Sequence, residues 1–117
     1  MAKYIPERND IIWLDFEPVK GKEIGKYRPA LVLSSQEYNK KTGLLICCPI
    51  STSIRGGATE VPVKNMDKPS VVAASLIQTL SWPDRSAKKI TTAENGVMHD
   101  VLIRLIPLIG ADTLFEE

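Results

Sequence analysis

Short apolar runs that end at turn-forming residues constrain the fold of this chain more than any other feature. In residues 10–16, Ile12, Leu14 and Phe16 fall on one face of an extended chain, and Pro18 lies just beyond the run. An apolar position at every second residue is typical of a strand that packs one face against a core. These residues therefore predict a first strand.

Further segments of this kind follow. Four are rich in apolar or β-branched residues: 30–34, 44–50, 59–63 and 70–80. Each predicts a strand, and the last is long enough for two. The polar residues 39–43 are typical of a turn, and we expect a helical turn just before them, around residues 36–39.

From Thr91 the periodicity changes to steps of three and four residues. This spacing predicts a C-terminal helix with Thr92 as its N-cap and Pro107 near its end. Its apolar positions are Val97, Val101, Leu102, Leu105 and Ile109. Several short strands and one terminal helix predict a mainly β fold with some α: a small, twisted antiparallel barrel or half-barrel closed by the helix.

Length and composition favour one globular domain over residues 1–117. Hydrophobic residues make up 44% of the chain and charged residues 25%, which is ordinary globular composition. The longest apolar stretches, 44–50 and 102–110, are much shorter than the about 20 residues of a membrane-spanning helix. The first residues lack the apolar core of a signal peptide. We expect a cytoplasmic protein that is not inserted in a membrane.

Several common kinds of chemical site are excluded by the residue inventory. His99 is the single histidine, which excludes a histidine pair within one chain, and we expect it on the surface. Cys47 and Cys48 are adjacent, so on a strand they point to opposite faces and do not form a disulfide with each other. The Gly21-x-x-x-Gly25 loop leads into a strand instead of a helix, unlike a nucleotide-binding loop. No metal or cofactor is expected.

The charge is uneven although the net charge is only +1. Residues 1–58 carry nine Lys or Arg against six Asp or Glu. Within residues 20–28 there are four basic residues and one acidic residue. Two interpretations of this basic loop remain open: a solvated loop that keeps the chain soluble, or a site for an anionic partner.

Arg28 lies where this loop enters the second predicted strand, and Ser51 and Thr52 follow the third. If these strands are neighbours, Arg28 and Ser51 meet at one end of the barrel, where a guanidinium and a hydroxyl match a phosphodiester. Alternatively, residues 51–53 are only the polar end of a strand.

Four segments together resemble the MazF/PemK family of toxin endoribonucleases, in order and in spacing: residues 9–18, 25–34, 38–43 and 49–52. The most specific element is Gly-x-x-Arg-Pro-Ala at residues 25–30, followed by Pro-x-hydroxyl at 49–51. The resemblance implies a PemK-like barrel related to SH3 folds and a homodimer. It also implies cleavage of single-stranded RNA at a short sequence without a metal ion.

The resemblance also implies catalytic roles. Arg28 matches the catalytic arginine of the family and Ser51 matches its catalytic threonine, while Thr52 could share that role. Glu23 falls where the family has an acidic residue, and Tyr27 replaces a histidine. RNA cleavage by the 2′-hydroxyl needs a base and stabilisation of a phosphorane. Arg28 suits stabilisation and Glu23 is the best candidate for the base.

RNA contacts are expected from basic and aromatic side chains. The expected set is Lys20, Lys22, Lys26, Tyr27, Arg55, Trp82 and Arg85. Trp13 more often belongs to a core or a dimer interface at such a position, and RNA contact remains the open alternative. Residues 76–78 read Leu-Ile-Gln where the family has Gln-Val-Lys, so one basic contact is missing and the sequence preference cannot be transferred.

The family implies a MazE-like antitoxin whose acidic tail fills the RNA groove, and the basic loop is a suitable landing site for it. Two alternative functions remain open. One is a gyrase-inhibiting toxin of the same fold, although this chain lacks the tryptophan-bearing tail of those toxins. The other is a non-catalytic RNA-binding regulator, suggested by the changes at Ser51 and Tyr27.

Overall fold

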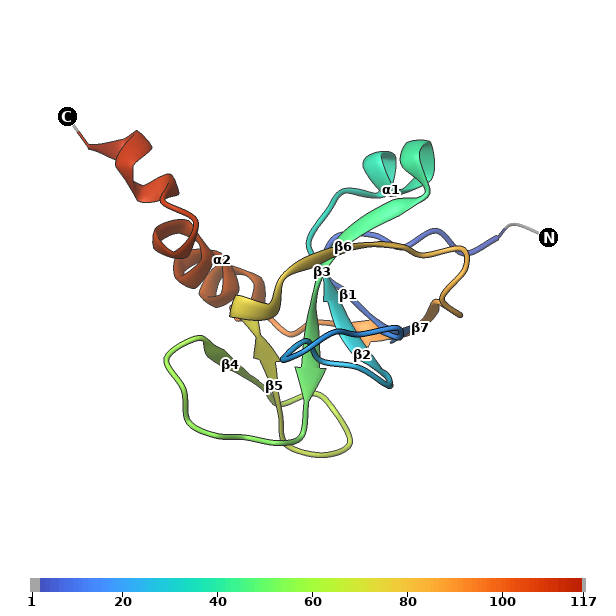
Figure 1. Ribbon diagram of the computed structural model, residues 1–117, viewed down its shortest axis with the longest axis horizontal. Coiled ribbons are helices and arrows are strands. Elements are labelled where there is room, and N and C mark those ends of the chain that lie inside the picture. Colours follow the sequence, from blue (N-terminus) through green and yellow to red (C-terminus); the bar gives the residue numbers. More distant parts are fainter. Residues whose placement is uncertain (1–2, 117) are drawn as a thin grey trace.

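The computed structural model describes residues 3–116, and within them seven strands form one curled antiparallel sheet (Figure 1). The strands are β1 (Asp10–Asp15), β2 (Tyr27–Val32), β3 (Leu44–Ser51), β4 (Glu60–Val63), β5 (Ser70–Ala73), β6 (Gln78–Ser81) and β7 (Lys88–Thr92). Their order is β4-β5-β3-β2-β1-β7, and β6 also pairs with β3. The expected half-barrel with a C-terminal helix is confirmed.

The strand β3 gives the sheet its curl because it has two successive partners. Residues 44–47 pair with β6, whereas Ile50 and Ser51 pair with β5. The other neighbour of β3 is β2, with Ala30 opposite Pro49 and Leu31 opposite Cys48. The C-terminal end of β3 therefore lies between β2 and β5.

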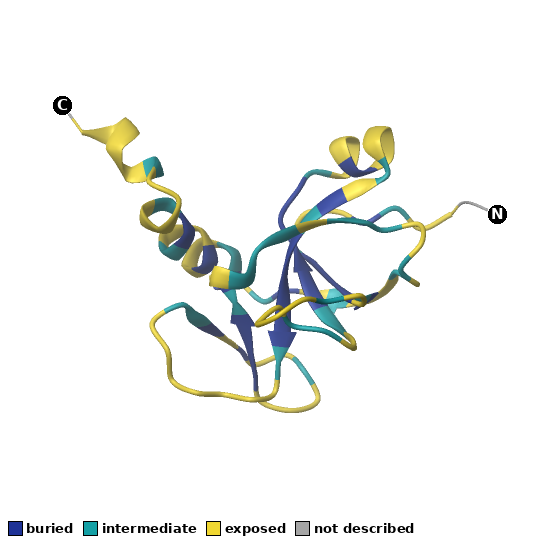
Figure 2. Ribbon diagram, in the orientation of Figure 1, coloured by how far each residue is buried: buried dark blue, intermediate teal, exposed yellow. Residues whose placement is uncertain are grey.

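The sheet has an apolar cluster on each face, and its strands form the buried centre of the molecule (Figure 2). Ile12, Leu14 and Phe16 share one cluster, as their alternation predicted. Cys47 belongs to that cluster and Cys48 to the other, and both thiols are free and buried. The prediction that the two cysteines point to opposite faces is confirmed.

A short helix, α1 (Gln36–Thr42), connects β2 to β3. Ser35 caps it by accepting a hydrogen bond from Tyr38 N–H at 3.2 Å, and Gly43 ends it with a left-handed φ of 71°. The helical turn expected around 36–39 is therefore present but longer. The turn chemistry expected over 39–43 is confined to Gly43.

The C-terminal helix α2 (Val97–Leu108) starts later than the sequence predicted. Val97, Val101 and Leu105 are buried in the cluster that contains Cys48, as their spacing indicated. Thr92 is not its N-cap, because residues 88–92 form β7, which pairs with β1. Leu102 and Ile109 do not belong to the buried face, since they are 43% and 69% exposed. Two 3₁₀ turns, Ala74–Leu76 and Ala111–Phe115, complete the helical elements.

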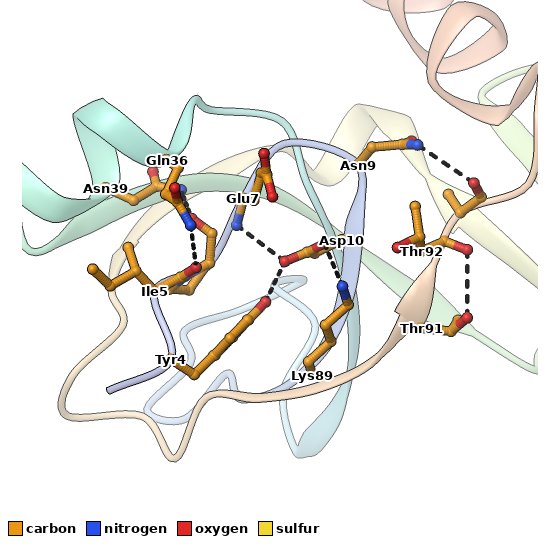
Figure 3. A network of polar contacts seen from close by, with 12 residues as sticks. Tyr4, Ile5, Glu7, Asn9, Asp10, Gln36, Asn39, Lys89, Thr91 and Thr92 are labelled. Atoms are coloured by element: carbon orange, nitrogen blue, oxygen red, sulfur yellow. Dashed lines mark hydrogen bonds and ion pairs between the residues drawn. The ribbon is translucent and has the colours of Figure 1, made fainter. Parts of the chain in front are cut away.

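A polar network attaches the N-terminal segment to β1 and β7 (Figure 3). The buried carboxylate of Asp10 accepts hydrogen bonds from Tyr4 O–H and from Glu7 N–H, the latter at 3.1 Å. Lys89 Nζ on β7 forms an ion pair with the other carboxylate oxygen at 3.3 Å. Asp10 thus has partners on both of its oxygens.

Among residues 3–116, no helix is both long enough and apolar enough to cross a membrane.

Candidate active site

Arg28 and Ser51 lie at the same end of the neighbouring strands β2 and β3. Ala30 pairs with Pro49, and two residues further along each strand this antiparallel register brings Arg28 opposite Ser51. Both side chains line one cavity of about 260 Å³. Its other lining residues are Lys26, Tyr27, Pro29, Ile50, Thr52 and Ser70. The structure thus brings the predicted arginine and both predicted hydroxyls to one site.

The guanidinium of Arg28 is held by the loop that precedes it. Its Nε donates a hydrogen bond to the Gly25 carbonyl at 2.6 Å. Its terminal nitrogens have no hydrogen-bond partner among residues 3–116, so they remain available to an incoming anion. Burial lowers the pKa of Arg28 from its ordinary value. A partly desolvated cation attracts a phosphate more strongly than one in bulk water.

Ser51 lies between two cavities. Its Oγ accepts a hydrogen bond from Ser53 N–H at 3.0 Å, which leaves the hydroxyl proton free to donate. Ser51 lines the cavity that contains Arg28, and it also lines a second cavity of about 420 Å³.

Glu23 and Arg55 lie in this second cavity, together with Lys22. Glu23 Oε1 accepts a hydrogen bond from Lys20 N–H at 2.6 Å, so the carboxylate also closes its own loop. Glu23 and Arg28 therefore line different cavities, and Ser51 is the residue that the two cavities share.

A third cavity, of about 480 Å³, adjoins the first on its other side. The two share Pro29, Thr52 and Ser70. Trp13 lines this third cavity and stacks on Tyr27, with ring centroids 5.3 Å apart and an interplanar angle of 17°. The Tyr27 hydroxyl donates to the Ser86 carbonyl at 3.1 Å. The Tyr27 ring is therefore fixed in position at the edge of the site, and its hydroxyl is already used in a hydrogen bond.

Most of the expected RNA-contact residues lie at or near the cavities. Lys22, Lys26, Tyr27 and Arg55 line the cavities, and Lys20 is exposed on the same loop outside them.

The structure does not bring Trp82 and Arg85 into the cavities. Trp82 Nε1 donates to the Asn39 carbonyl at 2.9 Å, beside α1 at the opposite end of β3 from Ser51. Arg85 Nη1 donates to the carbonyls of Asp15 and Glu17, at 3.0 and 2.8 Å. Both side chains are committed to the protein backbone.

Some site residues were not predicted from the sequence. Ser70 reaches the Arg28 cavity because β5 pairs with the end of β3, and nothing local in the sequence marks that contact. Leu76 lines the second cavity, within the segment that departs from the family pattern. His99 is exposed, as expected, and lies beside Asp100. In the described part of the chain, no three His, Cys, Asp or Glu side chains are grouped as metal ligands would be.

The sequence matches a family model over most of its length. The model of PemK-like, MazF-like toxins of type II toxin–antitoxin systems matches residues 7–109. The chain is 34% identical over 110 residues to the endoribonuclease toxin MazF of Escherichia coli K12, which covers 94% of this chain and 99% of that protein. It is 34% identical over 105 residues to the endoribonuclease toxin ChpB of the same strain, covering 85% and 90%.

Solved structures agree with the sequence matches. The crystal structure of MazF from Deinococcus radiodurans superposes with a TM-score of 0.89 at 36% identity, covering 92% of this chain and 99% of that one. A crystal structure of MazE–MazF from the same organism gives a TM-score of 0.82 at 36% identity, covering 92% and 98%.

Proposed function

The chain belongs to the family of PemK-like, MazF-like toxins of type II toxin–antitoxin systems, and we propose that Arg28 and Ser51 carry its endoribonuclease activity. The observation that carries the proposal is their position on opposite strands of one cavity. A guanidinium and a hydroxyl at such a site can both donate to the oxygens of one phosphate.

In the proposed reaction, the ribose 2′-hydroxyl loses its proton to a base and attacks the adjacent phosphorus, and the expelled 5′-oxygen takes up a proton from water. Arg28 stabilises the doubly charged phosphorane through its free terminal nitrogens, and Ser51 donates its hydroxyl proton as a hydrogen bond to a non-bridging oxygen. Arg28 is a poor base because a guanidinium stays protonated at neutral pH. Thr52 lines the same cavity and offers a second hydroxyl that could share the role of Ser51.

Glu23 is proposed as the base for the 2′-hydroxyl. Its Oε1 is occupied by Lys20 N–H, so Oε2 is the oxygen left to receive the proton. Glu23 and Arg28 line two different cavities that share Ser51, so a nucleotide bound across Ser51 could contact both side chains. Proton transfer requires the 2′-hydroxyl to come within hydrogen-bond distance of this oxygen.

Single-stranded RNA suits the succession of three cavities. The scissile phosphate would occupy the Arg28 cavity, with the neighbouring nucleotides on either side of it. Lys22, Lys26 and Arg55 would neutralise the flanking phosphates, with Lys20 further out on the loop. Tyr27 and Trp13 would offer a surface on which a base can stack.

The proposed protein partner is a MazE-like antitoxin, since structural relatives include MazE–MazF complexes. An acidic tail would bind the same basic loop as RNA and exclude it by occupying the site. We further propose a homodimer in the cytoplasm, with residues 1–117 as one domain.

The test is incubation of the purified protein with a long single-stranded RNA in excess chelator, followed by mapping of the product ends. The proposal predicts cuts at a short sequence that leave 2′,3′-cyclic or 3′-phosphate ends. Binding without cutting would favour a non-catalytic regulator. Intact RNA with inhibition of gyrase would favour a gyrase poison, which the endoribonuclease names of the relatives do not support.

A further inference from the structure

The loop between β1 and β2, residues 16–26, is held closed by a carboxylate that lies outside the three cavities. Glu17 Oε2 accepts a hydrogen bond from Lys26 N–H at 2.8 Å. Phe16 N–H donates to the Lys26 carbonyl at 3.0 Å, and the Phe16 side chain is buried in the core. Both backbone groups of Lys26 are therefore bonded to the residues that open the loop.

The Glu17 carboxylate also lies directly against Gly25. A Cβ added to Gly25 would lie 2.5 Å from Glu17 Oε2, closer than any real side chain approaches. Lys26, whose N–H donates to this carboxylate, has a left-handed φ of 72°. A side chain at position 25 would therefore force the Glu17 carboxylate out of its present position.

One peptide group connects Glu17 to Arg28. The N–H of Lys26 and the carbonyl of Gly25 belong to the same planar peptide unit, so fixing the direction of one fixes the other. Glu17 accepts from the N–H, and the carbonyl accepts from Arg28 Nε at 2.6 Å. Hydrogen bonds at the two ends of one peptide also polarise and strengthen each other.

Arg85 fixes the backbone of Glu17. Its Nη1 donates to the carbonyls of Asp15 and Glu17, and its own carbonyl accepts from Asp15 N–H at 2.9 Å. The backbone of Glu17 is therefore fixed to the segment before β7, while its side chain extends toward Lys26.

We propose that Glu17 is a positioning residue for Arg28. By fixing the Gly25–Lys26 peptide plane, its carboxylate directs the Arg28 guanidinium toward the cavity shared with Ser51. The inference rests on the proposed role of Arg28 in cleavage. Because Glu17 lines none of the three cavities, its loss changes the rate of the bound complex and not the binding of RNA.

A kinetic cycle tests this coupling. Glu17→Ala is expected to lower kcat about 10-fold while KM changes by less than about twofold, since small displacements of a catalytic group are costly. Glu17→Gln keeps an oxygen acceptor and recovers most of the rate. In Arg28→Lys, which has no Nε to direct, adding Glu17→Ala costs less than about twofold. Equal losses in both backgrounds, or a loss confined to KM, would overturn the proposal.

The control is Glu37→Ala, which removes an exposed carboxylate paired with Lys41 on α1 and leaves the loop intact. Cleavage by this variant should match that of the unmodified protein. A similar loss in Glu37→Ala would attribute the Glu17 effect to net charge and overturn the proposal.

A second measurement does not depend on cleavage. The Nε–H proton of Arg28, assigned by its absence in Arg28→Lys, should exchange slowly in the RNA-free protein and in Glu17→Gln but rapidly in Glu17→Ala. Slow exchange in Glu17→Ala would overturn the proposal even if activity fell. Cleavage by Arg28→Ala at the unmodified rate would instead overturn the proposed function. The exchange rate would still show whether Glu17 maintains the hydrogen bond from Arg28 Nε to the Gly25 carbonyl.

Discussion

At the scale of single residues, the proposed chemistry depends on the position of Arg28 and Ser51 opposite each other in one cavity. The sequence allowed this proximity to be predicted. Arg28 and Ser51 lie at similar distances, before and after, from the centre of the segment that connects β2 to β3. Antiparallel neighbours with a short connection bring such residues together. The helix α1 is that short connection.

Replacement of Ser51 tests the hydroxyl of this pair. Ser51→Ala is expected to lower the single-turnover cleavage rate about 100-fold, the typical cost of losing one preorganised donor. Ser51→Thr keeps the hydroxyl and should stay close to the unmodified rate, and Thr52→Ala should lose less than Ser51→Ala. A larger loss in Thr52→Ala would assign the hydroxyl role to Thr52 instead.

The sequence could not show which charged or aromatic side chains are free. Arg85 and Arg55 are equally basic in the sequence, yet Arg85 is bonded to two backbone carbonyls and Arg55 lines a cavity. Trp82 likewise uses its N–H on the carbonyl of Asn39. A guanidinium or indole N–H can contact RNA only if no backbone carbonyl of the fold accepts its hydrogen bond. The sequence composition does not show which carbonyls are available.

At the scale of elements, the loop of residues 16–26 connects the fold to the site. It begins at a buried phenylalanine and ends two residues before Arg28, and its shape depends on Glu17 and Gly25. The sequence identified this loop from its charge, but charge alone did not indicate that Glu17 and Glu23 both accept backbone N–H groups.

Gly25→Ala tests the shape of this loop. The added Cβ would lie 2.5 Å from Glu17 Oε2, so the carboxylate must move away from Lys26 N–H and the cleavage rate should fall about 10-fold. The melting temperature should change little because the loop is mostly exposed. Gly57→Ala is the matched control, since its nearest contact would be 4.0 Å away. Unchanged cleavage by Gly25→Ala would contradict the role given to the loop.

The start of α2 was wrong in the sequence prediction for an identifiable reason. The strand β7 has two lysines and two threonines and lies at the edge of the sheet, so it lacks the apolar alternation that marks the other strands. Its pairing with β1 creates the strand and displaces the helix toward Gly96. The buried helical positions Val97, Val101 and Leu105 were identified correctly because they follow the helical period.

At the scale of the whole molecule, one sheet separates two apolar clusters, and adjacent residues of β3 serve opposite clusters. The vicinal cysteines are the clearest case. Burial raises the pKa of the Cys47 thiol well above its usual range and that of Cys48 to about 12. Both thiols are therefore protonated in the folded state at physiological pH.

This burial predicts a loss of stability in alkali. Above a pH of about 9, the unfolded chain releases the thiol protons while the folded chain keeps them, so the stability present below pH 9 is lost as the pH rises. The free energy of unfolding should fall by up to about 1.4 kcal/mol per pH unit per thiol. Urea unfolding under reducing conditions from pH 8 to pH 10 measures this slope.

The control for this prediction is a Cys47→Ala, Cys48→Ala double variant. It should be less stable at pH 8 because it loses buried side-chain volume, but its dependence on pH should be flatter. An equal slope in both proteins would show that other groups cause the alkaline loss.

Arg28 is proposed to stabilise the phosphorane during metal-independent RNA cleavage. The most direct test is the single-turnover rate of Arg28→Ala on a mapped RNA site in excess chelator, with melting temperature as the check on folding. The Arg28→Ala variant is expected to cleave at least about 100-fold more slowly, with an unchanged melting temperature. A folded Arg28→Ala protein that cleaves that site at the unmodified rate would contradict it.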